Sequence, residues 1–567
     1  MFQNVFKPRL FETLKSYSGK QFSADFMAGI IVGIVAIPLA IAFGIASGVG
    51  PTEGLVTAII AGFIISAFGG TRVQIGGPTG AFIVIIYGII QQYGLSGLMI
   101  ATIMAGLLLI FMGVFKLGSI IKFVPYPVII GFTGGIALTI FSTQMNDFFG
   151  LGLKNVPADF ISKWIYYFQN ISHIHWASFA VAAGSLAVII VFPKISKKIP
   201  GSLVAIILAT VVVWVLKSFC GVSGITTIED LYKLPSGLPM PHLPELTLKE
   251  GQTFFLMLKD LFPPAFTIAM LGAIESLLSA MVADGVISDK HDSNTELIAQ
   301  GIANIASPLF GGIPATGAIA RTMTNINNGG RTPVAGIIHA GVLTLVLLFL
   351  GKLVGMIPMP CLAAVLVMVS YNMSGWRTFV ALAKNPKSDF AVLIVTFVLT
   401  VIFDLTIAIE IGLLLALLLF LRRTNETTEI RTFKNEIDPN DESDIILHDE
   451  EKLVIPQNVA VYEIDGPYFF FGIANKFEEV MSSIAERPKV RVIRMRKVAF
   501  IDSTGIHNLE TLCIRSEKEK VQIVLSGVNE RVRHTLEKAG FANVLKKEFI
   551  CSNINEALEK AGQIVGK

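Results

Sequence analysis

The sequence predicts an α-helical membrane protein in which fourteen spans form two inverted repeats of seven, followed by a small α/β domain. Three observations lead to this fold class: the composition, the spacing of the charges and a recurring Gly/Pro pattern. Of the 567 residues, 53% are hydrophobic and 15% are charged, whereas about a quarter are charged in an average globular protein. We therefore expect a membrane protein rather than a soluble one.

Charged residues are absent from four long stretches, residues 26–52, 73–115, 123–146 and 332–351. A spanning helix needs roughly 20 apolar residues, so each stretch can hold at least one span. Apolar runs bounded by charges or by Gly and Pro predict seven spans in residues 24–217 and seven in residues 260–422. The expected spans are residues 24–46, 54–70, 79–92, 96–115, 123–146, 175–193 and 201–217, then 260–285, 295–310, 317–329, 333–351, 357–373, 388–404 and 406–422.

Basic residues follow the sidedness of a bacterial inner-membrane protein. With a cytoplasmic N-terminus, the loops expected in the cytoplasm carry Arg72, Lys116, Lys122, Lys194, Lys197, Lys198, Arg331, Arg377, Lys384, Lys387, Arg422 and Arg423. This is the positive-inside pattern. The opening segment MFQNVFKPRLFETLKSYSGK lacks the apolar core and cleavage site of a signal peptide. We therefore expect both termini in the cytoplasm, a transmembrane domain over residues 1–423 and a cytoplasmic domain over residues 424–567.

Two motifs recur at nearly the same separation. GGPTG (76–80) returns loosely as GGIPATG (311–317), so that Gly80 corresponds to Gly317. VPYP (124–127) returns as IPMP (357–360), so that Pro125 corresponds to Pro358. Because each unit holds an odd number of spans, the second copy must be inverted in the membrane. Inverted repeats place a transport site near the bilayer midplane, between the repeats.

The third span of each repeat is too short to cross the bilayer and follows a Gly/Pro/Thr stretch. A half-helix that begins inside the membrane leaves its first N–H groups unpaired and carries about half a positive charge. Two such starts predict an anion-binding pocket built from neutral residues. The candidates are Thr79, Gly80, Ala81, Gly317, Ala318, Ile319 and Ala320. The alternative is two kinked helices that merely pack through small residues.

Glu275 and Arg321 lie deep in apolar sequence. Ionisable residues inside a membrane are functional candidates because burying either charge alone is costly. We expect the two side chains to face each other beside the pocket. The hypothesis is that Glu275 binds a proton and so couples proton binding to anion entry, while the alternative is a salt bridge that only holds two helices together.

No cofactor, metal or nucleic acid is expected. The four cysteines contain no CxxC pair, the histidines show no spacing that converges with carboxylates, and no basic segment is interleaved with aromatic residues. No nucleophile, base and orienting group converge, so an enzyme is not expected.

Four stretches carry a family resemblance: DFMAGIIVGIVAIPLAIAFGIASGVGPTEGL (25–55), GGPTGAF (76–82), PYPVIIGFTGG (125–135) and GGIPATGAIARTMTNINNGGRTPVAG (311–336). Together they resemble the sulfate permease family, whose animal members include the solute carrier 26 anion exchangers and prestin. The resemblance implies a moving core and a gate domain, an anion held between the third and tenth spans, and a homodimer in the lipid bilayer. Pro38 and Phe43 of the first stretch and Arg321 of the fourth complete the expected substrate-binding residues.

The C-terminal part resembles the STAS domain of that family. VAVYEIDGPYFFFG (459–472), VRVIRMRKVAFIDSTGIHNLETL (490–512) and VQIVLSGVNERVRHTLEKAG (521–540) look like its strands, loop and helices. Asp502 or Ser503 can cap the helix that follows. In the soluble anti-sigma factor antagonists that this domain resembles, the corresponding serine is phosphorylated. Ser503 is therefore a possible regulatory site, and the loop a possible docking surface for a cytoplasmic protein.

The same resemblance bears on the coupling ion. In the sodium-coupled cyanobacterial bicarbonate members, an acid in the eighth span and a hydroxyl one turn later help to bind sodium, and no arginine occupies the tenth-span position. Glu275 and Ser279 match the first feature, whereas Arg321 departs from the second. A guanidinium beside the site repels sodium. We therefore favour proton coupling or anion exchange over sodium coupling.

The predicted function is secondary active transport of sulfate, bicarbonate, chloride or small dicarboxylates. One alternative is a proton-coupled nucleobase carrier, which has the same inverted-repeat fold. Another is an anion channel, or a signalling platform in which the C-terminal domain acts. The sequence does not identify the anion, because backbone N–H groups accept all of these ligands.

Overall fold

The computed structural model forms two compact units, Met1–Ala416 and Leu417–Lys567. It describes residues 6–119, 125–154, 156–157, 159–195, 200–219, 224–232, 237, 240–243, 254–384, 386–403, 405–427, 429–433, 436–437, 453–465, 468–469 and 488–566. Cys220 and, in the expected C-terminal strand segment, residues 466–467 and 470–472 lie outside these ranges.

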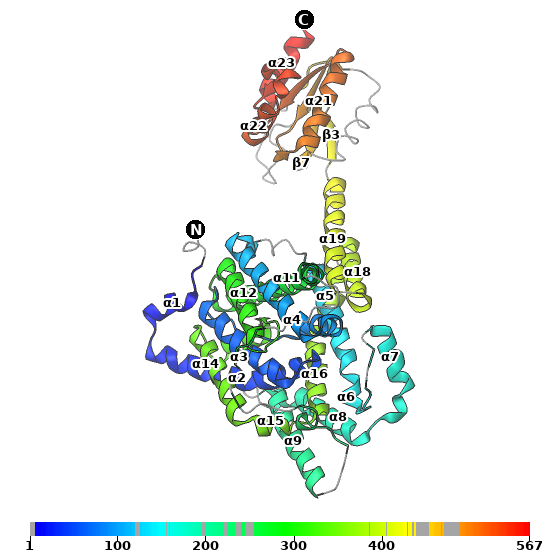
Figure 1. Cartoon of the computed structure of the whole chain (residues 1–567). Helices are drawn as coiled ribbons and strands as arrows, with labels where there is room; N and C mark the ends of the chain where they lie inside the picture. The colour runs from blue at the N-terminus through cyan, green and yellow to red at the C-terminus, as the bar shows by residue number, and fades with distance from the viewer. Residues whose placement is uncertain are drawn as a thin grey trace. The chain divides into compact units, whose positions relative to one another are not determined.

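The first unit is helical (Figure 1). Its longer helices are α2 (Gly19–Ala46), α3 (Pro51–Phe68), α4 (Ile83–Val114), α5 (Tyr126–Thr143), α8 (Trp176–Ile195), α9 (Gly201–Phe219), α11 (Phe254–Ile287), α12 (Ser293–Leu309), α14 (Val334–Phe349), α16 (Met359–Met373) and α18 (Lys387–Ile402). The shorter ones are α1 (Arg9–Thr13), α6 (Met145–Phe149), α7 (Phe160–Gln169), α10 (Ile228–Leu231), α13 (Ile319–Asn327), α15 (Gly351–Gly355) and α17 (Trp376–Leu382). Helix α19 (Leu405–Thr427) contains the boundary between the two units. Among the described residues, 8 helices are long and apolar enough to cross a membrane.

The third span of each predicted repeat is a short helix that follows an extended segment. In the first repeat, a 3₁₀ turn at Gly80–Phe82 leads into α4, and Gly94 breaks that helix with a φ of 69°. In the second repeat, α13 has 9 residues. Glycine tolerates a positive φ at no steric cost, so Gly94 separates a half-helix from the longer helix that the sequence predicts as the fourth span.

Packing divides the first unit into two groups of helices. One group consists of α2, α3, α4, α11, α12, α13 and α14, and the other of α5, α6, α8, α9, α16 and α18. Glycines bring α4 and α12 into backbone contact, because a Cβ added to Gly106 would lie 2.6 Å from the carbonyl oxygen of Gly301. Small residues at helix crossings allow this close approach in membranes.

The second unit contains an α/β fold with helices on both faces of a five-stranded sheet. The strand order is β11 (Ile550–Cys551), β10 (Gln522–Ser526), β8 (Val490–Arg494), β6 (Val459–Asp465) and β3 (Glu429–Phe433), and only β3 runs antiparallel to its neighbour. Helix α21 (Ser503–Lys518) and helix α22 (Glu530–Lys538) pack on one face, and α23 (Ile554–Val565) on the other. All five residues of β8 and residues 523–526 of β10 are buried, as expected for a sheet that is covered on both faces.

Candidate functional site

A two-stranded ladder joins the two short helices in the first unit. Strand β1 (Gly76–Gly77) pairs antiparallel with β2 (Thr316–Gly317), with Gly76 opposite Gly317. The ladder continues by one hydrogen bond, because the N–H of Ala318 donates to the carbonyl of Ile75 at 2.9 Å. The two recurring motifs therefore meet in space, although they belong to different predicted repeats.

The residues that follow the ladder differ in exposure. Gly80, Ala81, Gly317 and Ala318 are buried, whereas Ile319 and Ala320 at the start of α13 are exposed. The first N–H groups of a helix have no partner within that helix. The start of α13 is thus reachable by a small solute, while the strand before it is fixed inside the protein.

Glu275 and Arg321 contact adjacent residues of one segment. Thr79 Oγ1 donates to Glu275 Oε2 at 2.9 Å, and Arg321 Nη2 donates to the carbonyl of Pro78 at 3.2 Å. Arg321 is 2% exposed and Glu275 is half-buried. The described ion pairs include none between these two side chains, so no helix-locking Glu275–Arg321 salt bridge forms in this conformation.

Gly77 makes room for the guanidinium of Arg321. Its φ of 152° is one that side-chain-bearing residues rarely adopt, and a Cβ at this position would overlap Arg321 Nη1. Within the described part of the chain, Nη1 of Arg321 is buried without a hydrogen-bond partner. A buried charged donor without a partner is costly, so this nitrogen can donate to an anion at little further cost in desolvation.

Ser279 lies one turn after Glu275 on α11 and is buried. Its hydroxyl donates to Thr322 Oγ1 at 3.3 Å, and Thr322 Oγ1 also accepts from the N–H of Ile75 at 3.1 Å. The side chain therefore links α11 to α13 and to the segment before β1. It does not contact Glu275 in any described hydrogen bond.

Phe43 of α2 lies next to Gly80. A Cβ added to Gly80 would lie 3.5 Å from Phe43 Cε1, 3.3 Å from Ile140 Cδ1 and 3.0 Å from Met373 Sδ. Phe43 is 6% exposed. Pro38, more than one turn earlier in α2, is also buried. Phe43, Ile140 and Met373 therefore form an apolar wall beside Gly80.

Sequence reasoning missed the residues that hold the ladder in place. Ser276 Oγ accepts from the N–H of Gly317 at 3.0 Å and shares a hydrogen bond with Thr316 Oγ1 at 2.7 Å. Gln74 Nε2 donates to the carbonyl of Ser276 at 3.2 Å. The sequence did contain a signal for these residues. A small hydroxyl residue directly follows the buried acid (Ser276 after Glu275), and another directly precedes a motif glycine (Thr316 before Gly317).

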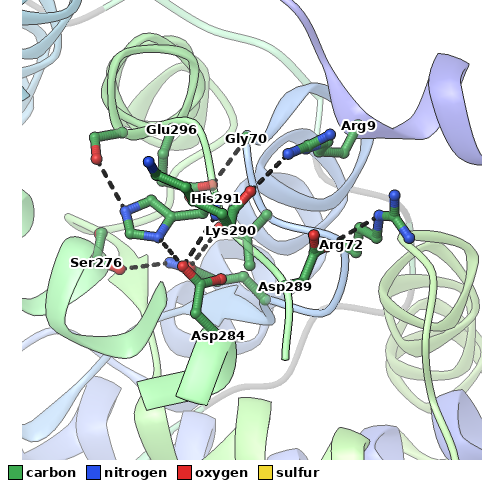
Figure 2. Close-up of polar contacts among 12 residues, drawn as sticks. Arg9, Gly70, Arg72, Ser276, Asp284, Asp289, Lys290, His291 and Glu296 are labelled. Atoms are coloured by element: carbon green, nitrogen blue, oxygen red, sulfur yellow. Dashed lines mark hydrogen bonds and ion pairs between the residues drawn. The ribbon is translucent and has the colours of Figure 1, made fainter. Parts of the chain in front are cut away.

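A second polar cluster lies at the ends of α11 and α12 (Figure 2). Asp284 Oδ2 lies 2.7 Å from His291 Nδ1, and His291 Nε2 lies 2.9 Å from Ser293 Oγ. His291 therefore contacts one carboxylate, although the described residues contain no group of three or more His, Cys, Asp and Glu side chains that could hold a metal ion. The loop geometry, with Ser288 at a φ of 54°, brings Asp284 and His291 together.

The cluster connects four segments of the chain. The buried carboxylate of Glu296 accepts from the N–H of Gly70 at 2.9 Å and from Thr71 Oγ1 at 3.0 Å. Arg72 Nε lies 3.1 Å from Asp289 Oδ2, and Arg9 Nη2 donates to the carbonyl of Lys290 at 2.6 Å (Figure 2). The N-terminal segment, the α3–β1 connection, the α11–α12 loop and α12 therefore meet at one end of the first helix group.

In the second unit, Asp502 is the N-cap of α21. Its carboxylate accepts from the N–H of Gly505 at 2.8 Å, while the side chain of Ser503 is exposed. A capping role for Asp502 is confirmed. The exposure leaves the hydroxyl of Ser503 free to be modified or to contact another protein.

The two cysteines of the second unit, Cys513 and Cys551, are free thiols and are buried. Burial, together with the nearby carboxylates of Glu510 and Glu517, raises the pKa of the Cys513 thiol to about 12. Burial also raises the pKa of the Cys551 thiol, and Glu556 adds to that effect. Thiols with raised pKa values are poor nucleophiles and poor metal ligands.

Two family profiles match the chain. That of the sulfate permease family matches residues 22–396, and that of the STAS domain matches residues 452–561. Similar proteins include YvdB of Bacillus subtilis, named as a candidate sulfate transporter, which is 41% identical over 89% of this chain and 91% of its own length. Bicarbonate transporter BicA of Synechocystis is 30% identical over 91% of this chain and 90% of its own length.

Solved structures agree in fold. The murine solute carrier 26 family member A9 anion transporter, in an inward-facing state, has a TM-score of 0.84 over 99% of this chain and 94% of that chain, at 18% identity. The transmembrane domain of a cyanobacterial BicA has a TM-score of 0.60 at 30% identity over 71% of this chain and 98% of that chain. The first likeness shows the fold alone.

Proposed function

We propose, from the premise that the chain belongs to the sulfate permease family, that it is a secondary active transporter which binds a small anion at the β1–β2 ladder. It is a multi-pass membrane protein of a transporter family, not an enzyme, and it ends in an α/β STAS domain. The observation that carries the proposal is the ladder itself, with a helix start beyond each strand and the unpaired Nη1 of Arg321 beside it.

Electrostatics favour an anion at this place. Each helix start contributes about half a positive charge, and the guanidinium of Arg321 adds a full one. Glu275 is the opposing charge, so a proton on its carboxylate makes the potential at the ladder more positive. We propose sulfate, bicarbonate, chloride or a small dicarboxylate as substrate, because backbone N–H groups accept any of them.

The proposed topology has fourteen spans in two inverted repeats, with both termini in the cytoplasm of a bacterial cell. The polar cluster of Figure 2 supports it, because Arg9, Arg72, His291 and the start of α12 would all lie on the cytoplasmic side. In alternating access, the two groups of helices would move against each other as core and gate. The ladder would move with the core, since α3 packs against β1 and α11 against β2.

Glu275 is the proposed coupling residue. In Glu275→Gln, the amide oxygen still accepts from Thr79, but the side chain no longer gains or loses a proton. We expect accumulation driven by an imposed gradient to fall at least about tenfold, with anion counterflow much less affected. Uptake into proteoliposomes at several pH values measures this, and Glu229→Gln, an exposed site on α10, is the control. Full pH-dependent uptake by Glu275→Gln would rule out this role for the carboxylate.

A transport assay with a panel of anions tests the function as a whole. Purified protein in proteoliposomes should show saturable counterflow of at least one of sulfate, bicarbonate, chloride and succinate, with or without a proton or sodium gradient. Uptake of labelled uracil instead would favour the nucleobase carrier. Conductance without saturable counterflow would favour a channel.

The STAS domain is proposed to regulate transport through the exposed start of α21. A phosphate on Ser503 would lie at a helix N-terminus, where anions are stabilised. Detection of phosphoserine at this position, or of a cytoplasmic protein that binds the same loop, would test the proposal.

A further inference from the structure

A cavity of about 150 Å³ lies away from the ladder, between the two groups of helices. Helices α2 and α4 of one group line it, together with α6, α7 and α16. Its ionisable lining residues are Tyr87 of α4, Asp147 of α6, and Lys163 and Tyr167 of α7. Taking about 30 Å³ for one water in the liquid, the cavity has room for about five waters or for one small oxyanion.

Lys163 is a buried cation without a bonding partner. The residue is 4% exposed, and in the described part of the chain its ammonium group makes no hydrogen bond or ion pair. Burial lowers the pKa of this ammonium, and the exposed carboxylate of Asp159, one turn earlier, partly offsets the effect. Because Lys163 lines the cavity, water or an anion in the cavity can bind its ammonium group.

Three further polar groups line the same cavity without protein partners. Within the described residues, the hydroxyls of Tyr87 and Tyr167 and the carboxylate of Asp147 take part in no hydrogen bond or ion pair. Burial, with smaller contributions from Asp147 and Tyr87, raises the pKa of Tyr167 above its usual value. Tyr167 therefore remains a hydrogen-bond donor. Lys163 and the two tyrosines are donors and Asp147 is a charged acceptor, and the polar residues Thr143, Gln144 and Asn146 also line the cavity.

The cavity lies on the outer side of the ladder in the proposed topology. It is lined by the last residues of α2, by α6 after the end of α5, and by the first residues of α16, and that topology places all three at the outer face. Tyr87 is seven residues beyond Gly80, about 10 Å along a helix. Phe43, which lies beside Gly80, directly follows Ala42 of the cavity wall.

We propose that this cavity is a second, outer binding site for the transported anion, selective for small oxyanions that carry one hydrogen-bond donor of their own. Lys163 and the two tyrosine hydroxyls donate to the anion's oxygens, and Asp147 accepts from its O–H group. Sulfate has no O–H group, so it cannot donate a hydrogen bond to the carboxylate of Asp147 and is repelled by its charge. The inference rests on the proposed function, since it assigns the cavity to the anion's path.

Full-length protein in proteoliposomes tests the site with labelled bicarbonate and labelled sulfate. In Lys163→Met, we expect the KM for anion supplied from the outer side to rise about tenfold, with the maximal rate and the KM from the inner side nearly unchanged. Lys154→Met, an exposed lysine that precedes α7, is the matched control and should change neither KM. Asp147→Asn should lower the preference for bicarbonate over sulfate from the outer side about tenfold.

Equilibrium binding of the same two anions to the purified full chain gives a readout that does not depend on transport. The wild type should bind two bicarbonate ions per chain and Lys163→Met one. One ion in both, or a KM that changes equally from both sides, would overturn the outer site. If the wild type shows no counterflow of any anion, the proposed function is refuted. The number of bicarbonate ions bound per chain would still test the outer site.

Discussion

Gly317→Ala is expected to reduce anion transport at least about 100-fold while the protein still reaches the membrane. A Cβ at position 317 would overlap the side-chain nitrogen of Gln74. That nitrogen is fixed by its hydrogen bond to the carbonyl of Ser276, and Ser276 in turn accepts from the N–H of Gly317. Either the Gln74 side chain or the strand has to move, which breaks this hydrogen-bonded arrangement, and a misplacement of about 1 Å at a site can cost about 100-fold in rate.

The matched control is Gly88→Ala. Gly88 lies in the half-helix that follows Gly80, and a Cβ there meets no atom within 4 Å. Anion uptake and the yield of monodisperse protein should both equal those of the wild type. A second variant, Gln74→Ala combined with Gly317→Ala, should recover part of the lost rate because the overlapping atoms are gone. Normal transport by Gly317→Ala alone would mean that the ladder does not position the anion site.

The sequence predicted the two segments that meet in the β1–β2 ladder because their signal is local. Gly and Pro interrupt an apolar run at GGPTG and again at GGIPATG, and each interruption precedes a short helix in the structure. Apolar runs bounded by charges or by Gly and Pro also placed most of the long helices, such as α2 and α14, within a few residues of their ends. Local sequence pattern was sufficient to predict a helix wherever the thickness of the membrane sets the length of that helix.

What the sequence could not predict depends on contacts between distant residues. Gln74 and Ser276 meet across 202 positions, and neither residue type is unusual for a helix or a loop. The turn that brings Asp284 and His291 together has a shape that the residue pattern does not predict. Helix α7 is too short and too aromatic to read as a span, so the cavity that it lines was also missed.

Arg321→Gln is expected to weaken anion binding about 10- to 100-fold, with a smaller effect on the maximal rate. Glutamine removes the charge and, because it is about two bonds shorter than arginine, it also loses the hydrogen bond to the carbonyl of Pro78. At a separation of about 6 Å and an effective dielectric constant of about 20, a unit charge contributes about 2.8 kcal/mol to an anion, or about 100-fold. The KM of counterflow measures the loss.

Two further variants separate charge from packing at this position. Arg321→Lys keeps the charge in a side chain that cannot span from α13 to both Gly77 and Pro78, so it should recover only part of the affinity. Arg377→Gln removes an exposed guanidinium that lies 5.5 Å from the ring centre of Trp376, and it should leave the KM unchanged. If Arg321→Gln kept the wild-type KM and lowered only the melting temperature, Arg321 would hold α13 against the ladder without contributing to the potential that attracts the anion. The unpaired Nη1 beside Gly77 argues for the first outcome, because a purely structural arginine would be expected to satisfy its buried donors within the protein.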